Sequence, residues 1–191
     1  MYEHMIAVTN RTLIENSRAA YLKQLGYIAS RQPRAMVLRE KDLNAEQYTQ
    51  LAAEVLTICG SHHTELLLHN FPEAALELGY YKIHLPLGRL RQLAGTPLYK
   101  KLEKNGTSVH SLEDAEEAIG LGADYLFAGN IYETDCKKGL PGRGLDFLRQ
   151  VCEISPVPVY AIGGITLPRL PELLEAGAAG GCMMSGFMKL K

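Results

Sequence analysis

The chain has 191 residues, and its 20 Lys and Arg residues nearly balance its 21 Asp and Glu residues, giving a formal net charge of −1. This balance disfavours nucleic acid as a partner, because domains that bind it usually carry a strongly basic face. With 47% apolar and 21% charged residues, the chain is not predominantly disordered. No run approaches the ~20 apolar residues of a membrane-spanning helix.

The N-terminus and the cysteines point to a cytoplasmic protein. The first residues, MYEHMIAVTNR, contain no cationic segment followed by an apolar stretch, so they do not look like a secretory signal. The cysteines at positions 59, 136, 152 and 182 form no CxxC pair. This spacing disfavours both a zinc site and a disulfide framework. We therefore expect a cytoplasmic protein with no membrane partner.

Short apolar runs alternate with segments of helical period along the whole chain. Strands buried on both faces are expected at 5–9, 35–38, 65–69, 82–85, 107–110, 124–128, 157–162 and 180–185. Helices are expected at 13–25, 45–58, 111–121 and 167–176. This alternation predicts an α/β fold with parallel strands, namely a (β/α)8 TIM barrel forming one domain over residues 1–191. A doubly wound open sheet is the alternative.

Signals for where helices start and stop add two expectations. Ser111 and Asp114 fit a capping box at the start of the 111–121 helix, and Gly122 is a plausible stop. Only residues 186–191 follow the last expected strand, so the barrel is expected to lack its final C-terminal helix. The strip left exposed there would be covered by a second copy, which predicts a homodimer.

In such a barrel, function lies on the loops that follow the strand ends. Gly163 and Gly164 follow the seventh strand, and Ser185 and Gly186 follow the eighth. Glycines let backbone N–H groups approach an oxyanion closely, and these two loops form the usual phosphate site of the fold. We interpret them as phosphate-binding rather than as two tight turns.

Arg39 and Lys41 follow the second expected strand. Cations two residues apart leave an extended chain on the same side and can reach one anionic ligand. The alternative is a solvated charge cluster in which Glu40 and Asp42 are their partners. Beside a phosphate site, the two interpretations carry similar weight.

Two further groups of side chains follow strands. Residues 129–144 form a long polar loop with three cations, among them Lys137, as in loops that close over an anion. His69, His84 and His110 end the third, fourth and fifth strands. No carboxylate pair accompanies the histidines, so we expect no metal. A histidine at a strand end more often only bonds to the backbone.

These residues occur in an order that resembles the thiamine phosphate synthase superfamily. The matching segments are 8–11, 38–42, 106–111, 123–125, 161–165 and 185–186. The run 133–140 with 142–144 is close to a signature of the TenI branch, the thiazole tautomerases. The resemblance implies a (β/α) barrel, usually dimeric, that binds a thiazole phosphate and needs no cofactor.

The resemblance departs from the synthases at their metal site. Synthases hold magnesium with an Asn-Asp pair after strand three and an Asp after strand four. Here the pair is replaced by His69 and Asn70, and residues 85–90 contain no Asp. Since magnesium prefers carboxylate oxygens, synthase activity is the less favoured interpretation.

A second departure concerns the tautomerases. Their proton-shuttling His after the glycine of strand six is replaced by Asn130, and an amide does not exchange protons near neutral pH as imidazole does. If the proton moves, His69 and His84 are the candidate bases. We expect a thiazole tautomerase of thiamine biosynthesis, with a synthase-like enzyme or a non-catalytic phosphate-binding regulator as alternatives.

The resemblance also assigns ligand contacts. Phosphate would be held at Gly163, Gly164, Ser185 and Gly186, and positive charge would come from Arg39, Lys41 and Lys137. The ring of the thiazole would be oriented by Ser108, Asn130 and Thr134.

Overall fold

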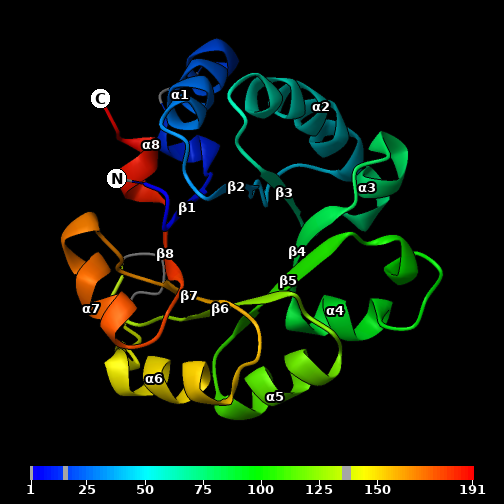
Figure 1. Ribbon diagram of the computed structural model, residues 1–191. Coiled ribbons are helices and arrows are strands. Elements are labelled where there is room, and N and C mark those ends of the chain that lie inside the picture. Colours follow the sequence, from blue (N-terminus) through cyan, green and yellow to red (C-terminus); the bar gives the residue numbers. More distant parts are fainter. Residues whose placement is uncertain (1, 15–16, 135–138) are drawn as a thin grey trace. The chain divides into compact units, whose positions relative to one another are not determined.

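The computed structural model describes residues 2–14, 17–134 and 139–191, which contain eight strands alternating with helices (Figure 1). The strands are β1 Met5–Val8, β2 Ala35–Leu38, β3 Leu66–His69, β4 Lys82–Pro86, β5 Lys104–Val109, β6 Tyr125–Gly129, β7 Val159–Ile162 and β8 Gly180–Met183. Their order, β1 through β8, is that of a closed parallel barrel. The predicted (β/α)8 fold class is confirmed.

Short 3₁₀ turns accompany the α-helices. The α-helices are α1 Arg18–Ser30, α2 Ala45–Ser61, α3 Pro72–Leu78, α4 Leu87–Leu93, α5 Leu112–Gly120, α6 Gly144–Ile154, α7 Leu170–Glu175 and α8 Ser185–Met188. The 3₁₀ turns are η1 Arg11–Leu13, η2 Tyr99–Lys101 and η4 Leu167–Arg169. Within the described ranges, no helix is long and apolar enough to cross a membrane.

The chain forms two compact units. The first comprises residues 1–84, 101–103 and 184–191. Its strands pair in parallel, with Val37 beside both Val8 and Leu67, and His69 beside His84. In β1 and β2 every residue is buried, as expected for strands covered on both faces. Figure 1 shows α1 and α2 side by side over these strands.

The second unit comprises residues 85–100 and 104–183. Here β5 to β8 pair in parallel. Gly106 leaves room for the ring of Tyr125, which a Cβ atom at that position would overlap. The Tyr125 ring packs against Phe127, with 5.3 Å between centroids, and Phe127 packs against Tyr160 at 6.2 Å. Aromatic packing therefore fills the space between these strands.

Two helix starts show how local hydrogen bonds decide a boundary. The helix expected at 13–25 instead begins at Arg18, because the Ser17 side chain accepts from the Ala20 N–H, and it runs to Ser30. At α5, Ser111 caps the Asp114 N–H at 3.0 Å as predicted. The Asp114 carboxylate accepts the backbone N–H of His110 at 2.8 Å, and not that of Ser111 as a full capping box would require.

The end of the chain corrects one expectation. A short helix, α8, follows β8, so the prediction that the barrel lacks a final helix is wrong in this detail. Packing of Phe187 holds this short helix in place, because the Phe187 side chain is fully buried and its ring centroid lies 5.1 Å from that of Tyr2. The Gln24 amide also donates to the carbonyl groups of Phe187 and Leu190, each at 3.0 Å.

Candidate functional site

The two acids in the segment after β2, Glu40 and Asp42, bind partners other than the two cations of that segment. Glu40 is only 2% exposed. Its carboxylate accepts hydrogen bonds from the Thr9 hydroxyl at 2.5 Å, the Tyr21 hydroxyl at 2.6 Å and the backbone N–H of Arg11 at 2.9 Å. Asp42 is paired with the Arg11 guanidinium at 2.5 Å. Both acids that could have neutralised the cations of this segment are therefore engaged elsewhere.

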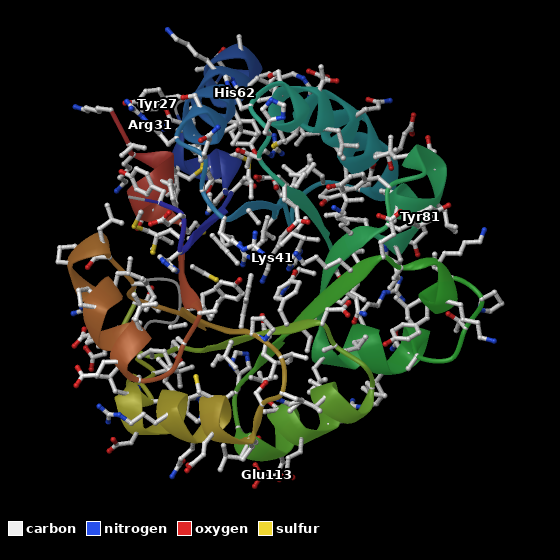
Figure 2. The ribbon with its side chains drawn as sticks, in the orientation of Figure 1. Tyr27, Arg31, Lys41, His62, Tyr81 and Glu113 are labelled. Carbon is white, nitrogen blue, oxygen red and sulfur yellow. The ribbon has the colours of Figure 1, made fainter. Side chains whose placement is uncertain are left out.

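Arg39 and Lys41 are left as a pair of cations. Lys41, which Figure 2 shows on the segment after β2, is exposed, and Arg39 is half-buried. The Arg39 charge lowers the pKa of Lys41, with loss of hydration adding to the effect. Among the described residues, neither cation has a carboxylate partner. The solvated cluster with Glu40 and Asp42 is thus not what forms, and the pair is suited to bind an anion.

His69 ends β3, whereas His84 lies in the middle of β4, so the prediction that His84 ends its strand is wrong. The two imidazole rings are nearly parallel. Their ring centroids are 5.9 Å apart, with 12° between the planes. Loss of hydration, followed by the charges of Arg39 and Lys41, lowers the pKa of His69 to about 3. Burial also lowers the pKa of His84 well below its usual value. Both imidazoles are therefore neutral at pH 7 and keep a nitrogen lone pair.

Tyr48 of α2 fixes the ends of β2 and β3 against each other. Its buried hydroxyl donates to the Leu38 carbonyl and accepts the His69 N–H, both at 2.7 Å. Its ring stacks on Phe71 with centroids 4.3 Å apart. One phenol thus sets where the chain leaves the sheet at Arg39 and at His69. In the sequence, Tyr48 is marked only by its place within the helical period of residues 45–58.

In the second unit, the glycine turn after β7 is held against the segment after β6. Gly163 and Gly164 have φ values of +96° and +66°, a region that glycine adopts at least cost. The Tyr132 N–H donates to the Gly163 carbonyl at 3.1 Å. A Cβ atom at Gly164 would lie 2.6 Å from the Glu133 carbonyl oxygen. The turn therefore has no room for a larger residue.

Arg169 completes this arrangement and was not anticipated. Its guanidinium donates to the Gly164 carbonyl at 2.6 Å and lies 3.9 Å from the centre of the Tyr132 ring. The Tyr132 hydroxyl in turn donates to Glu172 at 2.5 Å. The one sequence signal for this contact is that Arg169 is the cation of the 167–176 segment. The contact orients the peptide groups of the glycine turn.

Asn130 and His110 flank the last residue of β6. The buried Asn130 amide donates to the carbonyls of Tyr132 at 3.3 Å and Pro141 at 3.5 Å, tying the two described ends of the 129–144 loop together. The His110 Nδ1 lies 2.6 Å from the Gly129 carbonyl oxygen. Because a carbonyl oxygen only accepts, Nδ1 carries the proton. His110 therefore bonds to backbone, as the simpler interpretation of such histidines holds.

The remaining predicted residues fall into three groups. Ser108 and Thr134 are half-buried in the second unit with the glycine turn. Ser185 and Gly186 are exposed at the start of α8 and belong to the first unit with Arg39 and Lys41. Lys137 and Cys136 lie outside the described residues.

Comparison with known proteins decides the family. The family model described as thiamine monophosphate synthase, TMP-TENI, matches residues 5–187. The chain belongs to this family. It is 34% identical to a thiamine-phosphate synthase of Methanospirillum hungatei over 154 residues, covering 78% of this chain and 72% of that protein. It is 32% identical to a putative thiamine-phosphate synthase 2 of Aquifex aeolicus over 172 residues, covering 88% and 90%.

Solved structures support the fold of this TMP-TENI family member. A thiamine phosphate pyrophosphorylase from Pyrococcus furiosus superposes with a TM-score of 0.81 at 24% identity, covering all of this chain and 90% of that one. FabK from Thermotoga maritima gives a TM-score of 0.73 at 15% identity, covering 97% and 63%. At such identities the likeness concerns the fold alone.

The residues at the ends of β3 and β4 do not fit the magnesium ion that the resemblance to synthases implies. Magnesium is held by carboxylates and retained waters, whereas His69 and Asn70 supply an imidazole and an amide, and residues 85–90 supply no carboxylate. Arg39 and Lys41 act electrostatically on His69, so the local charge is positive. Among the described residues, no group of three His, Cys, Asp or Glu side chains is placed to bind a metal.

Proposed function

We propose that this TMP-TENI protein is a thiazole tautomerase of thiamine biosynthesis that acts on a thiazole carboxylate phosphate. The observation that carries the proposal is the Arg39–Lys41 pair, which has no carboxylate partner among the described residues and flanks the neutral His69. A ligand with a phosphate and a carboxylate would supply the missing negative charge. Within the second unit, the glycine turn at 163–164 would offer backbone N–H groups to phosphate.

The reaction would be a proton shift that makes the ring aromatic. A ring carbon loses a proton and the exocyclic carbon gains one, so the net change needs no metal or redox partner. His69 is neutral in the free protein and could accept the first proton, with His84 beside it. The pKa of about 3 makes His69 a weak base, and the ligand's negative charge would raise that pKa by offsetting Arg39 and Lys41.

A second candidate, a synthase-type transfer, is favoured by the names of the relatives. The donor set at the ends of β3 and β4, an imidazole and an amide without carboxylates, counts against it. Asn130 favours a third candidate, a regulator that binds the thiazole phosphate without turnover. In each case we expect a small phosphorylated thiazole as the partner and a cytoplasmic homodimer as the working form.

Two assays on the same protein separate these candidates. In the first, the exocyclic thiazole carboxylate phosphate is incubated with protein and EDTA, and the aromatic product is followed by chromatography against a protein-free control. In the second, a pyrimidine diphosphate and the aromatic thiazole phosphate are supplied with magnesium. We expect conversion above the control in the first assay alone. Magnesium-dependent product in the second assay alone would support the synthase, and binding without turnover would support the regulator.

A further inference from the structure

Glu40 lies between Arg39 and Lys41 in the sequence, but its carboxylate is not paired with either cation. Its carboxylate lies among Thr9, Tyr21 and the Arg11 N–H, and its charge helps to raise the pKa of Tyr21 and of Tyr48. The charge that acts on Lys41 is that of Arg39 instead. The segment after β2 therefore turns Glu40 toward Tyr21 of α1, and among the described residues it leaves Arg39 and Lys41 without a carboxylate partner.

A hydrogen-bond chain links this buried acid to the backbone that carries the cations. Thr9 donates its hydroxyl to Glu40 at 2.5 Å and accepts the Arg39 N–H on the same oxygen at 3.0 Å. The Thr9 N–H donates to the Val37 carbonyl at 3.0 Å. The segment is thus fixed at Val37, Arg39 and Glu40, immediately where β2 ends.

Three donors surround the Glu40 carboxylate. The two hydroxyls and the Arg11 N–H all point a hydrogen at it, and only a carboxylate accepts on both oxygens without offering a hydrogen of its own. Hydrogen bonds to a charged group are stronger than neutral ones.

We propose that Glu40 is a positioning residue for anion binding: its carboxylate, fixed by Thr9, Tyr21 and the Arg11 N–H, holds Arg39 and Lys41 as a preorganised pair facing the anionic group of the ligand. The identity of that ligand as a thiazole phosphate rests on the proposed function. The role of Glu40 as a support for the cation pair does not, since it concerns any phosphate bound there.

The test compares Glu40→Gln with Asp42→Asn. Both substitutions remove one negative charge and keep the side-chain size, but Asp42 is exposed and pairs with the exposed Arg11 guanidinium. Binding of inorganic phosphate and of the thiazole carboxylate phosphate is measured by calorimetry, and folding by circular dichroism and thermal melting. We expect Glu40→Gln to weaken the binding of both ligands by about tenfold or more, because the NH₂ group of the glutamine amide would face groups that donate to Glu40. Asp42→Asn should stay within about threefold of wild type.

Two further variants keep the test decisive if Glu40→Gln fails to fold. Tyr21→Phe removes one donor and should weaken phosphate binding less than Glu40→Gln does, while Glu40→Asp keeps the charge and should recover part of the affinity. In turnover assays the loss should appear in KM more than in kcat, which a general loss of folded protein would not produce.

The outcomes also separate this inference from the proposed function. Weakened phosphate binding in folded Glu40→Gln or Tyr21→Phe supports the positioning role, even if no tautomerase turnover is found. Wild-type phosphate affinity in those folded variants overturns it, as does a wild-type protein that binds neither ligand. Equal losses in Asp42→Asn would also overturn it, because they would show a simple effect of net charge.

Discussion

At the scale of single residues, the environment of each charged group decides its chemistry more than its identity does. His69 ends β3, His84 lies within β4 and His110 follows β5. His69 and His84 have lowered pKa values, while His110 bonds to the Gly129 carbonyl. The sequence indicated only that these histidines lie in or next to strands. Which one loses hydration beside two cations depends on contacts from distant segments, and no local pattern encodes them.

His69 offers the most direct residue-scale prediction. In His69→Ala, turnover of the thiazole carboxylate phosphate should fall by at least about a hundredfold, the usual contribution of a positioned proton-transfer group. The dissociation constant of the ligand should change little, because Arg39 and Lys41 remain. Kinetics and calorimetry on the same preparation measure the two quantities.

The matched control for this variant is His62→Ala, which removes an imidazole from the C-terminal end of α2. It should keep wild-type turnover. Full activity in His69→Ala would show that His69 is not the base, and would direct attention to His84.

At the scale of elements, strands were easier to predict than helices. Each strand overlaps one of the expected runs, because strands buried on both faces are largely apolar. The exception in composition is β5, which begins at Lys104 and has the mostly polar sequence KNGTSV. Three helices, α3, α4 and α6, carried no expectation, and α3 and α4 have only seven residues each. Two turns of helix leave too few positions for a helical period to be recognised. The loop at 129–144 was expected, but its tie through Asn130 was not.

The glycine turn after β7 gives the element-scale prediction. Gly164→Ala places a Cβ atom 2.6 Å from the Glu133 carbonyl oxygen and 2.7 Å from the Tyr132 Cβ, at a φ of +66°. The strain should cost about 1–3 kcal/mol of unfolding free energy. Phosphate affinity should fall as the turn moves, and denaturant titration with calorimetry measures both effects.

Gly60→Ala is the control for that prediction. Gly60 lies in α2, and the position that a Cβ atom would take there has no neighbour within 4 Å. Alanine should therefore raise stability by up to about 1 kcal/mol. Phosphate affinity should be unchanged. If Gly164→Ala behaved like Gly60→Ala in both measurements, the turn would not be a close-packed phosphate-binding element.

At the scale of the whole molecule, the two lowered histidine pKa values couple stability to pH. Each imidazole takes up a proton near pH 6.5 in the unfolded chain, but His69 does so only near pH 3 in the folded protein and His84 also well below 6.5. Below about pH 6.5 the unfolded chain therefore binds more protons than the folded one. The free energy of unfolding should fall as the pH drops from about 7 toward 3.

Denaturant midpoints between about pH 7 and pH 5 measure this coupling, in a range above the usual titration of carboxylates. His84→Gln should flatten the dependence, whatever its effect on absolute stability. An unchanged slope in His84→Gln would mean that this buried imidazole does not contribute to the coupling.

The single-domain organisation and the homodimer stay predictions.

The central claim is a metal-independent proton shift on a thiazole carboxylate phosphate. We would run this reaction in D₂O with EDTA and analyse the aromatic product by mass spectrometry and NMR. We predict that product forms faster than in the protein-free control and carries solvent deuterium on the exocyclic carbon that gains the proton. Product formation no faster than the control, in a protein that still binds the ligand, would contradict the tautomerase and leave a phosphate-binding member of the family.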